Sequence, residues 1–292
     1  MYCHHRGGCR QNCRKCDRLL RAGAQMRGPS PKIIAALALF VTTAAMSASA
    51  SDRVDLRFEV FAIAGLHILT TQTSAEVTPS GYSIAVDLNT RGIVSAFVDL
   101  HSRSEVYGTL SAQTVQPAAY RAEVQRNGTE RDYGVKYRAD GEVINTQAPS
   151  RKQKINIDAA QLRGTVDQLT AYFLVERQLA RTGSCGAVIP VYDGNELYRM
   201  RFTDIKDEAL APDGHQNFTG TTRRCEIVRE VIVGNPDIEE STYDRGRLWY
   251  ARLLPEGRML PVRMQYETPI GDVNGYLADI AGYGVHRNFE GE

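Results

Sequence analysis

Hydrophobic and polar residues alternate one by one along many short segments of the chain after residue 53. In the first segment Leu56, Phe58 and Val60 are separated by the charged residues Arg57 and Glu59. A period of two is typical of a β-strand that packs one face against a core. The strand-like segments are residues 56–60, 67–71, 82–88, 106–110, 119–124, 133–138, 188–192, 197–205, 227–233, 247–253, 260–266 and 273–280. The pattern therefore predicts about a dozen strands.

Short breaks separate these segments. Gly65 interrupts the chain between the first two strands, and Asp193-Gly194 predicts a tight hairpin turn in which glycine supplies a positive φ. Further turns are expected at 255–257 and 269–272, where proline and glycine stand close together. Breaks as short as these favour antiparallel neighbours in a sheet.

Helical periodicity is rare in the chain. Residues 93–100 are apolar enough for a short helix, and residues 167–179 place Leu169, Phe173 and Leu179 at helical spacing. Both helices are expected to pack against the sheet. We therefore predict a mainly β fold, in which one large, strongly curved antiparallel sheet forms an open barrel or a spiral and carries two short helices. A curved sheet has a concave face that can hold a ligand.

Residues 26–50 have the features of a secretory signal peptide in the expected order. Lys32 precedes the uncharged apolar run 33–45, and the small residues Ala48-Ser49-Ala50 follow. We therefore expect cleavage before Ser51 and a mature chain outside the cytosol. The alternatives are an uncleaved anchor, which would be the chain's membrane contact, or a buried core helix.

Residues 1–25 differ in composition from the rest of the chain. They hold cysteines at positions 3, 9, 13 and 16 and histidines at positions 4 and 5. A zinc site is one interpretation, but the cysteines lack the paired C-x2-C knuckles of a structural site. A signal peptide begins a few residues before its apolar core. We therefore interpret residues 1–25 as an extension upstream of a start at Met26, or as an unusually long n-region.

Residues 51–292 are expected to form a single β-rich domain. The stretch is long enough for a sizeable core, and no Pro/Gly/Ser-rich linker or low-complexity tract divides it. The first 50 residues hold eight of the 35 basic residues and one of the 34 acidic residues, which leaves a net charge of about −6 for the remainder. A nucleic-acid partner is not expected, because such a partner requires a basic face.

Two cysteines remain after residue 50, Cys185 and Cys225. In an oxidising compartment an even number favours one disulfide, here closing a loop of about forty residues. In the chain-entropy model such a bond stabilises the fold by roughly 3 to 4 kcal/mol. The alternative is a catalytic thiol activated by the neighbouring Arg223 and Arg224.

Candidate catalytic groups are sparse. The histidines after residue 50 are His67, His101, His215 and His286, and none stands in an H-x-x-x-H or H-E-x-x-H motif. Single histidines of this kind are expected to be surface residues or hydrogen-bonded structural residues. We therefore predict a non-enzyme with no catalytic residue, no metal site and no cofactor.

Acidic residues cluster in two places, at Asp204/Asp207/Glu208 and at Glu239/Glu240. Such groups can serve acid–base chemistry or bind calcium. A calcium loop requires D-x-D-x-D-G spacing, which is absent. Solvated turn charges are therefore the favoured interpretation.

Several large residues in predicted strands are candidates for ligand contact. They are Trp249, Tyr250, Tyr192, Tyr198, Tyr266 and Arg263. One interpretation is that the rings form the core under the helix predicted at 167–179. The other is that they form the floor of a groove for an apolar or glycan ligand, with Arg199, Arg201 and Arg263 at its rim.

Several short motifs follow one another in a characteristic order. They are Gly92-Ile-Val-Ser-Ala-Phe97, Asp167-Gln-Leu-Thr-Ala-Tyr-Phe-Leu174, Pro190-Val-Tyr-Asp-Gly194, Leu248-Trp-Tyr250, Leu260-Pro-Val-Arg263 and Tyr266-Glu-Thr268. This order, over residues 53–283, resembles the bacterial periplasmic family called domain of unknown function 3108. The resemblance implies an exported, β-rich, periplasmic envelope protein, and it brings no established catalytic residues.

The expected function is therefore support of cell-envelope integrity by binding an envelope lipid, glycan or protein. A hydrolase that acts on an envelope polymer is the alternative, and it would require a carboxylate pair on the concave face. An inert assembly factor held by protein contacts is a third interpretation.

Overall fold

The computed structural model describes residues 52–147, 157–215, 217–234, 245–255, 257–268 and 271–290. All of them belong to one compact unit, residues 47–292. The predicted signal peptide at 26–50 and the cysteine-rich stretch 1–25 lie outside the described residues.

One β-sheet contains fourteen strands of the described chain. The strands are β1 (Asp52–Phe61), β2 (His67–Val77), β3 (Gly81–Thr90), β4 (Leu100–Leu110), β5 (Val115–Arg126), β6 (Thr129–Tyr137), β7 (Val143–Gln147), β8 (Ala187–Tyr192), β9 (Leu197–Leu210), β10 (Gly220–Val233), β11 (Arg245–Arg252), β12 (Met259–Tyr266), β13 (Val273–Gly282) and β14 (Val285–Asn288). Neighbouring strands are antiparallel throughout. The strand order is β7-β6-β5-β4-β3-β2-β1-β13-β12-β11-β10-β9-β8, and β14 pairs with β13 off this path.

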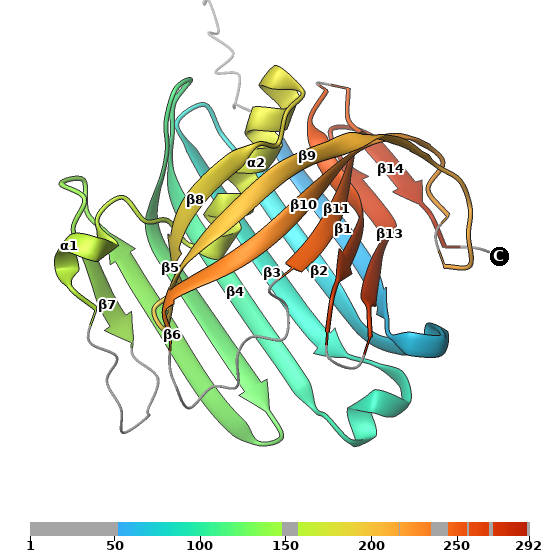
Figure 1. The fold of residues 1–292 in the computed structure, drawn as a ribbon, viewed down its shortest axis with the longest axis horizontal. Helices are drawn as coiled ribbons and strands as arrows, with labels where there is room; N and C mark the ends of the chain where they lie inside the picture. The colour runs from blue at the N-terminus through green and yellow to red at the C-terminus, as the bar shows by residue number, and fades with distance from the viewer. Residues whose placement is uncertain are drawn as a thin grey trace, which may run out of the picture. The chain divides into compact units, whose positions relative to one another are not determined.

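The sheet curves strongly and stays open. Figure 1 shows β8, β9 and β10 passing in front of β3, β4 and β5. Side chains, and no strand ladder, join the two ends of the sheet. The Tyr137 hydroxyl on β6 donates to the backbone oxygen of Tyr192 (3.0 Å), and the Asn145 amide on β7 donates to the Tyr192 hydroxyl (2.7 Å). The predicted fold class is confirmed.

Helix α2 (Gln168–Thr182) lies inside the curve, between β8 and the strands β4 and β5 (Figure 1). It begins after Asp167, whose side chain accepts from the backbone N–H of Thr170, and ends at Gly183 with φ 73°. The helix predicted at 167–179 is therefore confirmed. In the described part of the chain, no helix is both long and apolar enough to cross a lipid bilayer.

Buried side chains form three clusters. The first joins α2 to strands β8–β12. The second lies against β1, β11, β12 and β13. The third covers β3–β6, where Phe173 of α2 stacks on Tyr82 with ring centroids 5.0 Å apart. Residues Val54, Leu56 and Phe58 of β1 are buried, and the intervening residues point to the opposite face of the sheet.

The short helix predicted at 93–100 is present only in part. Residues Gly92–Ala96 form a 3₁₀ helix (η2), and β4 already begins at Leu100. Ile93 and Phe97 do not pack on the sheet, since 66% and 77% of their surfaces are exposed. So few residues cannot stabilise an α-helix in water without a buried face, and here the chain reverses direction between two paired strands.

Four short elements were not predicted. Strands β7 and β14, helix α1 (Ala159–Leu162) and the 3₁₀ helix η1 (Ile63–Gly65) each contain five residues or fewer. Segments this short show too few repeats for a period to be recognised.

Candidate functional site

An open cleft of about 750 Å³ lies on the face of the sheet opposite to α2. Strands β1, β2 and β13 form its floor, and the loop between β9 and β10 and the segment after β14 flank it. We call it the outer-face cleft. Its lining includes two of the four histidines singled out above, together with arginine, glutamate, tyrosine and phenylalanine side chains.

Aromatic rings form one wall of the outer-face cleft. Phe61, at the end of β1, and His215, in the β9–β10 loop, stack with centroids 3.7 Å apart and an interplanar angle of 7°. Tyr276 of β13 lies 6.0 Å from Phe61, and His67 lies 5.1 Å from it. Gly65 (φ 72°) permits this arrangement, because a Cβ there would lie only 3.0 Å from Nε2 of His215. The break predicted at Gly65 is therefore confirmed and brings the loop to the wall.

Polar groups form the floor of the outer-face cleft around Glu59. The carboxylate accepts from the Thr70 hydroxyl (2.6 Å), lies 2.8 Å from Nε2 of His67, and pairs with Arg57. Its side chain is only 16% exposed. The pairing of β1 with β2 positions these side chains next to one another, because Glu59 lies directly opposite Thr70.

Arg57 connects the floor to the end of the chain. Its guanidinium lies 2.7 Å from the Glu290 carboxylate, after β14. The hydrogen bond from Arg57 lowers the pKa of Glu290, and the bond to Glu290 raises the pKa of Arg57. Arg57 is therefore shared between the carboxylates of Glu59 and Glu290.

A carboxylate and an imidazole lie side by side in the floor of the outer-face cleft. Glu59 and His67 form two parts of an acid–base–nucleophile group, in which a carboxylate orients an imidazole. Within the described residues, no hydroxyl or thiol is hydrogen-bonded to the His67 ring.

A family model described as "Protein of unknown function (DUF3108)" matches residues 54–278. The chain belongs to the DUF3108 family. Among solved structures, the DUF3108 chain is similar to a β-barrel-like protein of domain of unknown function DUF1849 from Brucella abortus, with 12% identity and a TM-score of 0.47 over 80% of this chain and 99% of that chain. It is also similar to a "putative lipoprotein" from Parabacteroides distasonis ATCC 8503, with 13% identity and a TM-score of 0.34 over 80% and 96% of the two chains. No curated protein matches the chain.

The DUF3108 chain places its predicted aromatic candidates in the core. Tyr198, Tyr250 and the partly buried Tyr266 belong to the cluster under α2, whereas Tyr192 and Trp249 belong to the other two clusters. These rings do not share one face, and they contact protein groups. Their role in ligand binding stays a prediction.

Arg263 links this core to the outer-face cleft. Its guanidinium carbon lies 4.7 Å from the Trp249 ring centroid and 5.6 Å from that of Tyr276. The three residues stand side by side on neighbouring strands, since Arg263 pairs with both Trp249 and Tyr276. Arg263 therefore supports the cleft wall from one side through cation–π contacts.

The remaining histidines lie elsewhere in the DUF3108 chain. His101 on β4 is bonded to Asn89, and His286 on β14 lies 3.0 Å from Asp279. Both are exposed and serve as cross-strand hydrogen-bonding residues. No local sequence pattern indicates that His67 and His215 line the same cleft, because their placement depends on the path of the β9–β10 loop.

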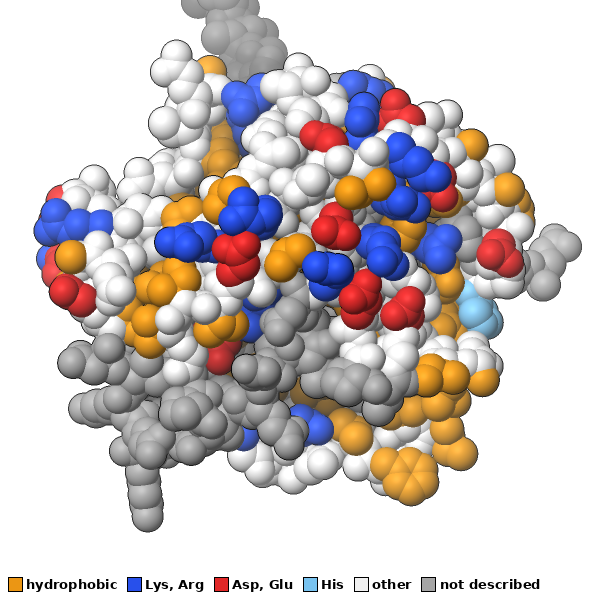
Figure 2. Space-filling model, viewed as in Figure 1, with side chains coloured by type: hydrophobic (Ala, Val, Ile, Leu, Met, Phe, Trp, Pro, Cys, Tyr) orange, Lys and Arg blue, Asp and Glu red, His pale blue; other side chains and the backbone are white. Residues whose placement is uncertain are grey.

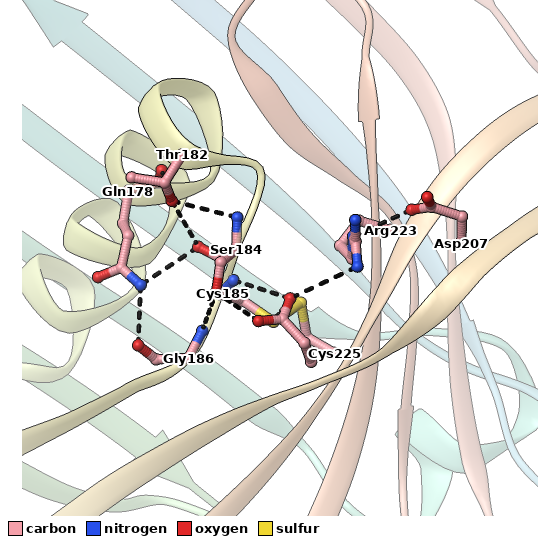
Figure 3. Close-up of a disulfide and its surroundings, with 9 residues drawn as sticks. Gln178, Thr182, Ser184, Cys185, Gly186, Asp207, Arg223 and Cys225 are labelled. Carbon is pink, nitrogen blue, oxygen red and sulfur yellow. Dashed lines mark hydrogen bonds and ion pairs between the residues drawn. A yellow bond between two sulfur atoms is a disulfide. The ribbon is translucent and has the colours of Figure 1, made fainter.

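A disulfide joins Cys185, after α2, to Cys225 on β10 (Figure 3). Both cysteines are fully buried. The Asp204 carboxylate beside the bond accepts from the backbone N–H of Cys185 (3.0 Å) and from the Ser184 hydroxyl. The predicted bridge is confirmed. Because the two sulfurs are bonded to each other, they are not thiolates that could act as nucleophiles.

The first predicted acidic cluster lies in strand β9 and not in a turn. Asp207 pairs with Arg223 (3.0 Å), and Glu208 pairs with Arg224 (3.1 Å). Their placement in a turn was therefore wrong, because the strand continues to Leu210 through these charged residues. The second cluster, residues 239–240, lies outside the described residues.

Proposed function

We propose that this DUF3108 chain is an exported periplasmic protein that binds, in the outer-face cleft, an envelope saccharide carrying an acidic group. The stacked rings of Phe61 and His215 beside the polar floor carry the proposal. Export is supported by the signal-peptide features of residues 26–50.

The aromatic wall and the polar floor suit the two sides of a sugar. A sugar ring has an apolar face, which packs well on a flat aromatic surface such as the Phe61–His215 pair. Its hydroxyl groups require both donors and acceptors. Gln72 and Asn217 line the cleft and supply amide donors and acceptors, and Glu59 accepts.

An acidic group on the ligand is favoured by the charges around the cleft. Arg57 is already shared between two carboxylates. Arg91 also lines the cleft, is exposed, and makes no ion pair within the described chain. A ligand carboxylate can accept two parallel hydrogen bonds from such a guanidinium, which adds both affinity and orientation.

Hydrolysis of a glycan is the less supported alternative. A glycosidase needs one carboxyl group that stays protonated at its working pH. The carboxylates lining the cleft, Glu59 and Glu290, both pair with Arg57, and this arginine lowers the pKa of Glu290. Glu290 is therefore not suited to act as the general acid, and Glu59 is already engaged by Arg57 and Thr70.

Binding can be tested with a matched pair of sugars. N-acetylmuramic acid and N-acetylglucosamine share one ring, and only the first carries a carboxylate. We expect N-acetylmuramic acid to bind with a Kd of about 1 mM and to shift the NMR signals of His67 and His215, whereas the neutral sugar binds more weakly.

Two exposed histidines provide the variant and its control. His215→Ala should abolish the binding, because it removes half of the stacked pair, and His286→Ala should leave it unchanged. The proposal fails if neither sugar binds, or if His215→Ala binds N-acetylmuramic acid as the unchanged protein does.

A further inference from the structure

Four large apolar side chains are exposed at one end of the sheet. Ile63 and Leu66, in the turn between β1 and β2, are 60% and 43% exposed. Ile93 and Phe97, in the turn between β3 and β4, are 66% and 77% exposed. Figure 2 shows hydrophobic side chains gathered at the lower right of the view, where these two turns lie in Figure 1. We call these four residues the apolar tip.

The second turn lies against the start of β2, directly after the first turn. The backbone N–H of Arg91 donates to the carbonyl of Ile68 (2.9 Å), and a Cβ at Gly92 would lie 3.1 Å from the carbonyl of His67. The apolar tip is also free of charge. Residues 62–66 and 92–98 contain no Asp, Glu, Lys or Arg, and Arg91 and Asp99 stand only at the borders of the second turn.

We propose that the apolar tip inserts into the surface of a lipid bilayer. The largest exposed apolar patch of a monomer is often functional. Two adjacent uncharged loop ends with an exposed phenylalanine suit the boundary between headgroups and acyl chains. At this boundary the polar backbone of the turns stays near water while the side chains leave it.

The area of the apolar tip favours a bilayer over a protein partner. The four side chains expose on the order of 500 Å², within the range of the largest patch of an ordinary monomer. A stable protein–protein interface buries roughly 800 Å² on each partner. The tip consists of two loop ends, and His101, at the start of the strand after the second turn, is polar and exposed. A bilayer requires no complementary surface beyond the tip itself.

Docking by the apolar tip would hold the outer-face cleft at the membrane surface. Arg91 lines the cleft and adjoins the second turn, and His67 lines it next to the first. The Arg91 guanidinium carries a positive charge, which favours anionic headgroups near the tip. Membrane docking goes beyond the proposed saccharide binding and does not depend on it.

Vesicle flotation of the exported protein tests the proposal. The probe is vesicles of phosphatidylethanolamine with phosphatidylglycerol. We expect the unchanged protein to float with the vesicles, and the double variant Ile93→Ser/Phe97→Ser to lose about tenfold or more in vesicle-bound fraction. Tyr107→Ser is the matched control, because Tyr107 on β4 is 59% exposed and lies outside the tip. It should float like the unchanged protein.

Three results would overturn the proposal. They are absence of the unchanged protein from the vesicle fraction, equal flotation of the double variant and the unchanged protein, and a dimer in size-exclusion chromatography that the double variant abolishes. Thermal unfolding of the double variant should match that of the control, since its side chains are exposed. We expect the double variant still to bind N-acetylmuramic acid. This result would show that membrane docking can be lost while saccharide binding in the cleft is retained.

Discussion

Asp167 fixes the start of α2 from within the core. Its carboxylate accepts from the backbone N–H of Thr170 (2.9 Å) and from the Thr170 hydroxyl (2.6 Å), and the Tyr82 hydroxyl lies 2.7 Å from that hydroxyl. Burial raises the pKa of Asp167 to about 6, and the hydrogen bonds from Thr170 lower it in part. The carboxylate therefore connects the helix to β3 through Thr170.

Replacing this cap should destabilise the protein. Asp167→Ala should lower the free energy of unfolding by about 1 to 3 kcal/mol, because it leaves the N–H and hydroxyl of Thr170 without their acceptor. Urea unfolding measures the change. Asp158→Ala, at the exposed N-cap of the short helix α1, should cost less than about 1 kcal/mol. Equal losses in the two variants would contradict the account.

Glu176 on α2 should make stability depend on pH. Burial raises its pKa to about 7 from 4.5, and Arg258 lowers it in part. The folded protein thus holds the proton more tightly than the unfolded chain. Stability from this group is fully present below about pH 4.5 and is lost as the pH rises through about 7. Because the side chain is partly exposed, we expect a loss of about 1 to 2 kcal/mol.

Glu176→Gln should flatten the dependence of unfolding free energy on pH between about 5 and 8, because glutamine does not titrate. Glu230→Gln is the control. Its exposed carboxylate pairs with Arg201, which lowers its pKa, so its titration lies below this window. An unchanged slope in Glu176→Gln would show that another group causes the pH dependence.

At the residue scale, the sequence alone was enough to predict the disulfide, because that prediction did not depend on how the chain folds. Cys185 and Cys225 were the remaining cysteines after residue 50, so their pairing followed from number and compartment. The contact between Phe61 and His215 could not be predicted in this way. It depends on the register of β9 with β10 and on the path of the loop between them. No local pattern encodes that path.

At the scale of elements, Gly65 in the β1–β2 turn leaves room for His215 of the outer-face cleft. Gly65→Ala should cost about 1 kcal/mol through its positive φ and should also displace His215, because the new Cβ would lie 3.0 Å from the ring. Gly128→Ala has the same φ strain, at 75°, with no atom within 4 Å. NMR should therefore show a shifted His215 signal only in Gly65→Ala. Matching His215 signals in both variants would contradict the packing.

The disulfide ties the end of α2 to β10. Replacing Cys185 and Cys225 together by serine should lower the free energy of unfolding by about 2 to 5 kcal/mol, the usual range for a native disulfide. Mass mapping without reductant checks the bond directly. Two free thiols in the exported protein would contradict it.

Strands and helices could be predicted where the pattern of hydrophobic and polar residues repeats several times. The long strands and α2 contain enough turns or alternations to show their period, and one buried face enforces it. The short helix predicted at 93–100 is a 3₁₀ helix of five residues, and its expected packing on the sheet was wrong, because Ile93 and Phe97 point outward at a hairpin end. Apolar composition normally indicates burial. A sequence-based prediction therefore places such a segment against the core even where its side chains are exposed.

At the scale of the whole molecule, the sheet joins distant parts of the sequence. Strand β1 pairs with β13, which brings Glu59 beside Tyr276 and places Glu290 within reach of Arg57. The sequence predicted a curved antiparallel sheet from its many strands. It could not predict this central pairing, because contacts between distant strands depend on the complete strand order.

The predicted signal peptide bears on where the molecule works. We predict that the chain is exported and that its mature form begins at Ser51, because Ala48-Ser49-Ala50 follows the apolar run of residues 33–45. Mass spectrometry of the protein from the envelope fraction measures this end. A membrane-bound chain that still starts at Met26 would mean that the segment is an anchor.

The central claim is that the outer-face cleft binds an acidic saccharide, and a crystal structure of the exported protein with N-acetylmuramic acid tests it most directly. We predict that the sugar ring lies on the Phe61–His215 pair and that its carboxylate contacts Arg91. A sugar bound on the concave face beside α2, or no bound sugar at saturating concentration, would contradict the account.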